Sequence, residues 1–326
     1  MQLRFLNYTF LFIVGILISI FSFGQLKWQN VDAEFQPLPA SVHVYKTTDM
    51  LDGKPNIAYY VEADLKDKKL DFTVDTTYQR RLSPSKFYEK NDKPLLVVNT
   101  TFFSFETNQS LNVVIKDKKL VGYSPNKYRK NKADSTMRIP VYSSAIGLTK
   151  KRHADIAWIK TDSSKKYAEA SQIPEPGKGY FIKRINRTTG ETLNSDYPGN
   201  FQTWKMQTAV GGGPVLIQNG EIKITNNEEL KFGGKAIDDK HPRTAMGYTK
   251  DNKLIILVIE GRNTGIAEGA SLNQEAQIFK DLGCWEALNL DGGGSSCMLV
   301  NGKETIKISD KTGQRPVPAV FIIKQK

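Results

Sequence analysis

The sequence is poor in the residues that bind transition metals. Only three histidines and two cysteines occur among its 326 residues, and they do not recur at the short spacings typical of zinc sites. We therefore expect no zinc site and no cofactor, and the alternative is a divalent cation held by Asp291 and Glu260. The two cysteines, Cys284 and Cys297, leave two alternatives open: a disulfide across the segment between them, or two separate buried thiols.

Long apolar segments are also missing after the first 24 residues. Arg4 precedes an almost unbroken apolar run over residues 10–21, and the small residues at 22–24 suit cleavage by a signal peptidase. This pattern predicts a signal peptide over residues 1–24 and a mature chain that starts at Gln25. The alternative is an uncleaved anchor, but polar residues shorten the run to the length of a signal-peptide core. We expect an exported protein, periplasmic, on the cell surface or secreted, with no stable membrane anchor.

The chain lacks the basic–aromatic strip that single-stranded nucleic acid requires. Its net charge is +12, yet the basic residues are scattered along the sequence rather than massed in one block. We therefore expect no nucleic-acid partner. A positive field of this kind also helps to gather an anionic substrate.

The remainder of the chain has the composition of an ordinary globular protein, with 39% hydrophobic and 25% charged residues. We predict one domain over residues 25–326, of the α+β or mixed α-β class. Short β-rich runs predict a mixed sheet core, and a C-terminal β-hairpin–helix–strand unit is expected to carry the site. The irregular stretch over residues 161–198 is predicted to be an insertion over that site rather than a second domain.

An acidic, glycine-rich turn stands between two apolar runs near the C-terminus. Asp291 is followed by three glycines and two serines, with residues 287–290 before the turn and 297–300 after it. Glycines let backbone N–H groups approach a ligand closely, so a carboxylate at this place suits chemistry. The alternative is a hairpin whose glycines only solve a tight bend.

Two neighbouring segments favour the functional interpretation. A strand opens at Arg243, turns near Asp251 and Asn252, and returns along an apolar run to Glu260. If the turn is centred between Asp251 and Asn252, hairpin pairing sets Arg243 opposite Glu260.

A helix follows this hairpin. Ser271 and Gln274 form a capping-box pattern, and apolar residues at helical spacing continue to residue 282. Strand 254–260, helix 271–282 and strand 287–290 predict a crossover between parallel strands. Glu260 and Asp291 then emerge at one edge of the sheet, where ligands bind.

Carboxylates on adjacent or next-nearest strands stand about 5 to 10 Å apart, which suits either a retaining or an inverting glycosidase pair. Arg243 and Arg262 can grip phosphate oxygens through their planar forks. The structural alternative is a set of Arg–Glu salt bridges at the strand ends.

At these residues the chain resembles the phosphodiester glycosidase family. The similar blocks cover most of the sequence from residue 42 onward, and they are Asn99-Thr100-Thr101-Phe102-Phe103, Gly211-Gly212-Gly213-Pro214, Arg243-Thr244-Ala245-Met246-Gly247, Glu260-Gly261-Arg262 and Asn289-Leu290-Asp291-Gly292-Gly293-Gly294-Ser295-Ser296. Two departures occur: Thr100-Thr101 replaces smaller residues, and Glu260 stands where Asp is frequent.

The resemblance implies hydrolysis of a sugar 1-phosphodiester, similar to one of N-acetylglucosamine, at the anomeric C–O bond. Asp291 and Glu260 are the expected catalytic pair. Phosphate and sugar contacts are expected from Arg243, Thr244, Arg262, Asn99, Phe102, Gly212, Asn289, Gly292, Gly293 and Ser295. The expected partner is a phosphodiester-linked glycan or glycoconjugate. The alternative function is a non-catalytic glycan-binding protein of the cell surface that kept the pocket and lost turnover.

Overall fold

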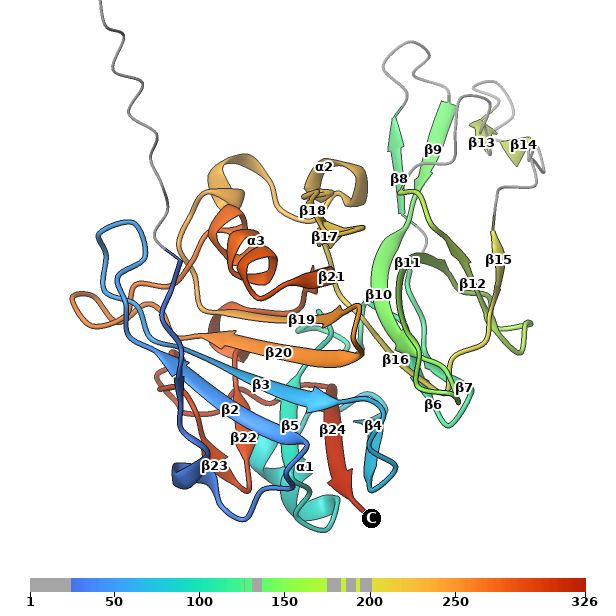
Figure 1. Cartoon of the computed structure of the whole chain (residues 1–326). Coiled ribbons are helices and arrows are strands. Elements are labelled where there is room, and N and C mark those ends of the chain that lie inside the picture. Colours follow the sequence, from blue (N-terminus) through green and yellow to red (C-terminus); the bar gives the residue numbers. More distant parts are fainter. Residues whose placement is uncertain (1–24, 126, 131–136, 175–182, 186–191, 194–200) are drawn as a thin grey trace, which may run out of the picture.

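The computed structural model describes residues 25–125, 127–130, 137–174, 183–185, 192–193 and 201–326 (Figure 1). The predicted signal peptide over residues 1–24 and much of the predicted insertion over 161–198 lie outside the described residues. Within these ranges the protein is rich in β-strands and has few helices, as predicted. Every strand pairing in them is antiparallel, so the prediction of a mixed sheet is wrong.

The largest sheet carries the strands of the predicted C-terminal unit. It has eight strands, in the spatial order β1 (Gln29–Asn30), β2 (Val42–Thr47), β3 (Ala58–Asp64), β20 (Lys253–Ile259), β19 (Arg243–Thr249), β21 (Cys284–Asn289), β17 (Val215–Gln218) and β18 (Glu221–Ile222). A five-stranded sheet lies across it in the order β23 (Lys303–Glu304), β22 (Met298–Val300), β5 (Leu96–Asn99), β24 (Ala319–Gln325) and β4 (Leu70–Thr76).

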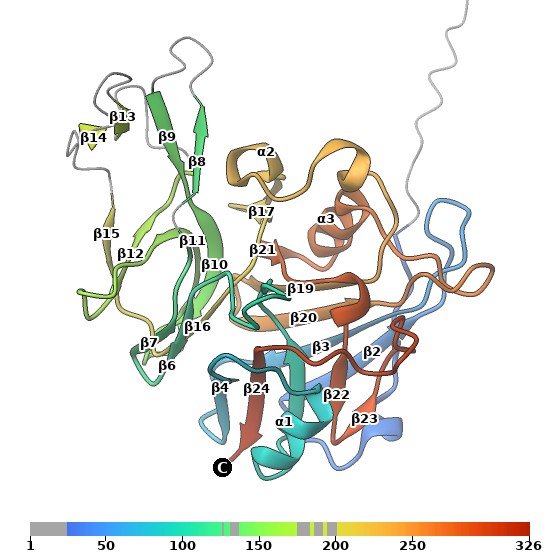
Figure 2. The same ribbon diagram turned by 180° about the vertical axis from the view of Figure 1, so that it is seen from behind.

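Two further sheets form a lobe beside these, in Figure 1 and from behind in Figure 2. One has the order β15 (Gln202–Trp204), β12 (Ala168–Ser171), β11 (Ala154–Lys160), β10 (Ser143–Leu148), β16 (Thr208–Gly211), β6 (Val114–Lys116) and β7 (Lys119–Gly122). The other has the order β14 (Thr192–Leu193), β13 (Lys183–Ile185), β9 (Met137–Val141) and β8 (Lys127–Lys130). Both views place the β8–β9 hairpin beside α2 (Asn226–Glu229).

The helices of the described residues are short apart from α3. They are α1 (Pro84–Lys90), α2, α3 (Leu272–Asp281) and the 3-10 turns η1 (Asp32–Phe35), η2 (Gly234–Ile237) and η3 (Gly293–Ser295). The predicted capping box of α3 is confirmed, because the Ser271 side chain accepts from the Gln274 N–H and the Gln274 side chain accepts from the Ser271 N–H. None of these helices is long and apolar enough to span a bilayer.

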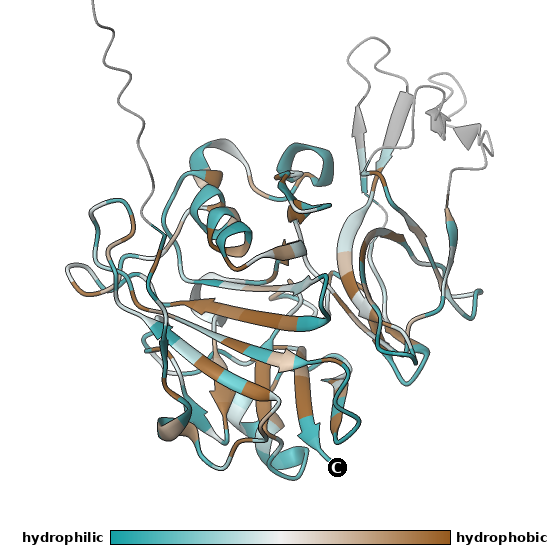
Figure 3. Cartoon of the chain, viewed as in Figure 1, coloured by the Kyte–Doolittle hydropathy of each residue, from teal (hydrophilic) through white to brown (hydrophobic). Residues whose placement is uncertain are grey.

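Strand β20 is buried on both faces, which explains its unbroken apolar sequence. Leu254, Ile256 and Val258 join a core between the eight-stranded sheet and the other sheets. The alternate residues Ile255, Leu257 and Ile259 instead join a second cluster under α3. Figure 3 shows the resulting hydrophobic colour along most of this strand. A strand with two buried faces needs apolar residues at every position.

The predicted register of the β19–β20 hairpin is wrong by one residue. Arg243 pairs with Ile259 rather than with Glu260. The turn has an odd number of residues, because Tyr248 pairs with Leu254 and residues 249–253 connect them, with Asn252 at φ 71°. A shift of one residue moves a side chain to the other face of the sheet. Arg243 and Glu260 therefore do not face each other.

Strands β20 and β21 run in the same direction without pairing. Each is antiparallel to β19, which lies between them, and α3 connects their ends. Residues that follow β20 and β21 therefore leave the sheet at the edge where β19 begins.

The two cysteines are both free and buried. Cys284 packs under α3, whereas Cys297 packs in a different cluster around α1 and β5. Of the two alternatives left open by the sequence, the structure has separate buried thiols.

Candidate active site

Three segments meet at the glycine-rich turn between β21 and β22. The Asp291 N–H donates to the Thr100 carbonyl at 2.8 Å, and the Gly293 N–H donates to the Pro242 carbonyl at 2.8 Å. Residues that follow β5, precede β19 and follow β21 are thereby joined through their backbones. The pairing of Ala245 with Asn289, extended along the strands, sets Arg243 opposite Asp291.

The Asn99 side chain forms hydrogen bonds with both ends of this turn. Its side-chain NH₂ donates to the Asp291 carbonyl at 2.6 Å, and its Oδ1 accepts from the Cys297 N–H at 3.0 Å. The Thr244 hydroxyl donates to the same Oδ1 at 2.9 Å. Both side chains are fully buried. One amide thus holds both ends of the loop that carries Asp291.

The Asp291 side chain combines partial exposure with strong desolvation. The residue remains accessible to a ligand, yet the protein around its carboxyl raises its pKa to about 7. The Ser295 hydroxyl and the Gly292 N–H oppose this rise, as do the charges of Arg315 and Lys231. Because the Ser295 Oγ makes no hydrogen bond of ordinary geometry, it lowers the pKa of Asp291 only weakly. A carboxyl with such a pKa exchanges its proton near neutral pH.

Two arginines lie against the glycines of the turn. Gly293 has φ 62°, and a Cβ added there would stand 3.0 Å from the Arg262 Nη2. At Gly294 an added Cβ would come within 2.5 Å of the Arg315 Cζ. The positive φ favours glycine at position 293, and the lack of a side chain at both positions leaves room for the guanidinium groups. The turn that carries Asp291 is therefore contacted by two cations, and the charge of one of them, Arg315, lowers the pKa of the Asp291 carboxyl.

The two arginines differ in how they are held. The Arg315 Nε donates to the Asp310 carboxylate at 2.7 Å. Arg262 is exposed and makes no hydrogen bond or ion pair within the described part of the chain. Its backbone is nevertheless constrained at φ 61°. Arg262 thus offers its N–H groups to a ligand.

Arg243, the other predicted phosphate contact, is buried under η2 and α3. Its Nε donates to the Ala270 carbonyl at 2.8 Å and its Nη2 to the Asp239 carbonyl at 3.1 Å. Burial lowers its pKa, and the charge of the fully buried Glu275 opposes that shift. Burial in turn raises the pKa of Glu275 to about 8. The pair consists of an ionised guanidinium and a carboxyl that is neutral at pH 7.

A lysine approaches Asp291 from the segment after α2. The Lys231 Nζ donates to the Gly212 carbonyl and lies 4.9 Å from the centre of the Phe102 ring. Burial lowers its pKa to about 8, and the charge of Asp291 opposes the shift. Phe102 also contacts Phe232 edge to face, with ring centres 6.0 Å apart. Phe102 and Gly212 therefore line the same side of the site as Lys231.

Glu229 joins this side of the site to the neighbouring lobe. One carboxylate oxygen accepts from Val215 N–H, Thr225 hydroxyl and Trp158 indole N–H, at 3.0, 2.7 and 3.2 Å. The other accepts from the Ser144 N–H and hydroxyl, both at 2.9 Å. Five donors satisfy a fully buried carboxylate. This arrangement fixes the segment that carries Lys231.

Glu260 lies in a different environment from Asp291. It is 4% exposed, and its two oxygens accept from the Asn263 side-chain amide at 3.1 Å and from the Lys307 N–H at 3.0 Å. Ser309, two residues beyond Lys307, donates to the Gly293 carbonyl at 3.2 Å. Glu260 thus binds the segment over residues 307–309, and this segment contacts the glycine-rich turn at Gly293. Glu260 is not among the residues that most shift the pKa of the Asp291 carboxyl.

Buried polar atoms without a partner gather around this turn. Asn289 is buried, and its NH₂ donates to the Gly213 and Leu290 carbonyls, while its Oδ1 has no partner. Most other such atoms among the described residues belong to segments that meet here, and they are Thr101 Oγ1, His241 Nδ1, Ser295 Oγ, Ser296 Oγ and both Glu275 carboxyl oxygens. Unpaired buried groups in this number indicate a binding place for water or ligand.

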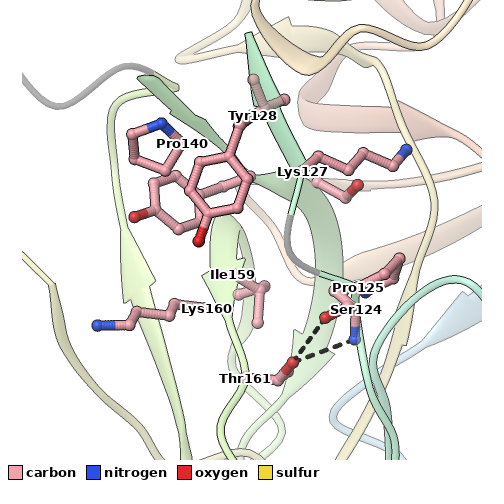
Figure 4. Close-up of a pocket in the computed structure, with 11 residues that line it drawn as sticks. Ser124, Pro125, Lys127, Tyr128, Pro140, Ile159, Lys160 and Thr161 are labelled. Atoms are coloured by element: carbon pink, nitrogen blue, oxygen red, sulfur yellow. Dashed lines mark hydrogen bonds between the residues drawn. The ribbon is translucent and has the colours of Figure 1, made fainter. Parts of the chain in front are cut away.

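A separate hollow of about 140 Å³ lies in the neighbouring lobe (Figure 4). The Thr161 hydroxyl closes one end by accepting from the Ser124 N–H and donating to the Ser124 carbonyl, both at 3.1 Å. Lys127 borders it, and its charge also lowers the pKa of Lys231. The hollow therefore adjoins the Lys231 side of the site but does not contain Asp291.

Sequence reasoning missed Lys231, Glu275 and Arg315. Lys231 and Arg315 lie in polar segments without regular periodicity, and Glu275 occupies the fourth position of an otherwise ordinary helix. The fold brings Lys231 and Arg315 to Asp291 and brings Glu275 to Arg243. No cluster of three His, Cys, Asp or Glu side chains able to hold a metal occurs in the described ranges.

Comparison with known proteins shows the family of the chain. The sequence profile of the family described as phosphodiester glycosidase matches residues 92–324. The chain is similar to the N-acetylglucosamine-1-phosphodiester alpha-N-acetylglucosaminidases of Mus musculus and Bos taurus, with 28% and 30% identity over 95 residues. It is also 41% identical over 71 residues to the SPbeta prophage-derived uncharacterized protein YomE of Bacillus subtilis (strain 168).

The matched stretches are short. They cover 27% of this chain and 18% of each mammalian enzyme, and 22% of this chain and 11% of the Bacillus protein. The chain thus matches less than a fifth of the length of these relatives.

Solved structures show the fold more completely. The catalytic domain of the zebrafish N-acetylglucosamine-1-phosphodiester alpha-N-acetylglucosaminidase, auto-inhibited by its pro-peptide, has a TM-score of 0.55 at 19% identity. That match covers 93% of this chain and 89% of the zebrafish chain. A hypothetical protein from Synechocystis has a TM-score of 0.59 at 15% identity, covering 91% and 63% of the two chains. Since the family profile spans well over half of its length, this chain belongs to the phosphodiester glycosidase family.

Proposed function

We propose that this protein hydrolyses a sugar 1-phosphodiester at the bond between the anomeric carbon and its oxygen. The observation that carries the proposal is a carboxyl of Asp291, with a pKa of about 7, on a turn contacted by two guanidinium groups. The names of the mammalian relatives support phosphodiester-linked N-acetylglucosamine as the substrate class. The proposed substrate is a glycan or glycoconjugate that carries this linkage.

In this proposal Arg262 contacts the phosphate. It is the exposed arginine at the turn, and its N–H groups are not used within the described residues. Arg243 contributes positive charge without touching the phosphate, because its N–H groups already bind two backbone carbonyls. A phosphomonoester is a good leaving group, so holding its charge matters more than protonating it.

Asp291 acts in its ionised form at the anomeric carbon. Glycosidic cleavage passes through an oxocarbenium-like centre, which a nearby carboxylate stabilises, either by direct attack or by activating water. The Phe102 ring, the Gly292 backbone and the Ser295 hydroxyl are assigned to the sugar. Gly212 and Gly293 shape the site for Lys231 and Arg262.

The buried polar residues serve to hold the catalytic loop. We assign positioning roles to Asn99, Thr244 and Asn289, because their hydrogen bonds fix the backbone on either side of Asp291. Glu260 as a second catalytic carboxylate stays a prediction. Its two hydrogen bonds support a positioning role instead, through the segment that contacts Gly293.

Export and a single catalytic domain over residues 25–326 are part of the proposal. The signal-peptide pattern supports export. A structural neighbour described as a putative exported protein from Burkholderia pseudomallei K96243 is in keeping with it, with a TM-score of 0.55 at 16% identity over 83% of this chain and 74% of that chain.

The test is incubation with a panel of sugar 1-phosphodiesters, with the free sugar followed by proton NMR and the phosphomonoester by phosphorus NMR. Equal release of both products by the wild type, and none by Asp291→Asn, is the expected result. Tight binding of the same compounds with no release would support the alternative, a non-catalytic glycan-binding protein.

A further inference from the structure

An aromatic ring beside the turn is held between two arginines. Phe105 is 65% exposed, and its ring centre lies 5.1 Å from the Arg81 Cζ and 5.6 Å from the Arg315 Cζ. Phe103, which is nearly buried, contacts it with ring centres 4.8 Å apart. A single exposed apolar residue is ordinary, but a ring that orients two guanidinium groups is not.

Arg315 links this ring to the catalytic turn. Its guanidinium lies on Gly294, its Nε is bound by Asp310, and its charge lowers the pKa of Asp291. The ring of Phe105 therefore stands directly beside the turn rather than on a remote surface.

Arg81 completes the arrangement from the segment before α1. Its Cζ lies 5.1 Å from the ring centres of both Phe103 and Phe105. No carboxylate or carbonyl in the described part of the chain accepts a hydrogen bond from its guanidinium. Stacking on rings leaves the N–H edge of a guanidinium available for planar, bidentate contact with an oxyanion.

We propose that Arg81, Phe105 and Arg315 form a subsite for a second anionic group, carried on the aglycone of the scissile phosphodiester. This inference rests on the proposed function and narrows its substrate class. The physiological substrate is then a glycan whose aglycone carries an anionic group beyond the scissile phosphate, as in a chain of phosphodiester-linked units. Arg262 holds the scissile phosphate, while Arg81 holds the next anionic group.

A different result is expected if Arg81 has only a structural role. If Arg81 only pins the loop around Phe103 and Phe105, its removal lowers stability and affects all substrates alike. If it binds an anionic aglycone, its removal affects only substrates that carry one.

The experiment compares Arg81→Gln with Arg80→Gln. Arg80 is the neighbouring residue, is exposed, and its substitution removes the same charge without touching the stacked rings. Three probes share one sugar 1-phosphate and differ in the aglycone, which is methyl, carboxymethyl or 2-phosphoethyl. The last two distinguish a carboxylate from a phosphate as the second group.

For Arg81→Gln we expect about a tenfold rise in KM on at least the 2-phosphoethyl probe, with kcat unchanged. The methyl probe should be unaffected, and Arg80→Gln should match the wild type on all three. Phe105→Leu should show the same selective rise, because it removes the ring on which Arg81 stacks, while Arg315 stays bound to Asp310. An equal loss on the methyl probe, or no loss on either anionic probe, would overturn the proposal.

A binding measurement separates this inference from the proposed function. Ethane-1,2-diol bisphosphate is titrated into the Asp291→Asn protein with and without Arg81→Gln. Weaker binding in the doubly substituted protein supports the subsite even if no probe is hydrolysed. Equal binding contradicts it even if the methyl probe is hydrolysed.

Discussion

The two acidic residues that follow strands of the large sheet differ in what surrounds their carboxyl groups. Asp291 and Glu260 both follow buried strands that run in the same direction. The charges of Arg315 and Lys231 act on the Asp291 carboxyl, which remains accessible and whose pKa is raised by burial. Glu260 is buried, and both of its oxygens are bound by the protein. A carboxylate that is accessible to a ligand can react with it, whereas one whose two oxygens are bound by the protein is suited to holding a segment in place.

The largest expected effect separates these acids directly. Asp291→Asn should lower kcat on a sugar 1-phosphodiester by on the order of a thousandfold or more, because it removes the group that acts in the transition state. Glu260→Gln should lower it by only about tenfold, through displacement of the segment bound to Lys307. Initial rates with thermal melting as a folding control measure both. Equal losses in two well-folded proteins would show that Glu260 is also catalytic.

The arginines at the turn provide the next comparison. Arg262→Gln should raise KM by about tenfold or more for every sugar 1-phosphodiester, since it removes charged hydrogen bonds to the scissile phosphate. The folding stability should hardly change, because Arg262 is exposed and unpaired among the described residues. Arg80→Gln is the matched control. An unchanged KM for Arg262→Gln would remove this arginine from the phosphate site.

The pH dependence of the reaction sharpens the assignment to Asp291. Burial raises its pKa to about 7, so the ionised fraction and kcat/KM should rise with pH and level off above about 7. Arg315→Gln should move this limb to higher pH, because the charge of Arg315 lowers the pKa. Rate profiles from pH 4 to 9 measure both. A limb near pH 4, or no movement in the variant, would contradict the assignment.

The smallest effect concerns stability rather than rate. Burial raises the pKa of Glu275 from its ordinary 4.5 to about 8, so the folded state binds this proton more tightly than the unfolded chain. The wild type therefore loses stability as pH rises from about 4.5 to 8. Glu275→Gln should match the wild type at pH 5 and exceed it at pH 8 by on the order of 2 kcal/mol.

Urea unfolding at the two pH values measures the difference. The charge of Arg243 lowers the pKa of Glu275, so pairing of the two groups will reduce the gain in stability. A variant that is less stable than the wild type at pH 8 would show that ionised Glu275 supports the fold.

Much of the local structure could be predicted from sequence, because it depends on neighbouring residues. The capping box indicated the start of α3, and the apolar run over residues 254–259 indicated a strand. The hairpin register could not be predicted, because it depends on a single αL residue, Asn252, that makes the turn odd.

The candidate site divides in the same way. Asp291 could be located because glycines and a carboxylate mark it in one short stretch. Lys231, Glu275 and Arg315 carry no local pattern, since the fold brings Lys231 and Arg315 to Asp291 and Glu275 to Arg243 from separate segments of the chain. The stacking of Arg81 on Phe105 likewise depends on two loops that only the fold brings together.

The most direct test of the central claim, cleavage of the anomeric C–O bond at Asp291, is hydrolysis in water enriched in oxygen-18. We predict that the label enters the free sugar and not the phosphomonoester, and that incorporation is lost in Asp291→Asn but kept in Glu260→Gln. Label in the phosphomonoester, or a wild-type rate in Asp291→Asn, would contradict the claim.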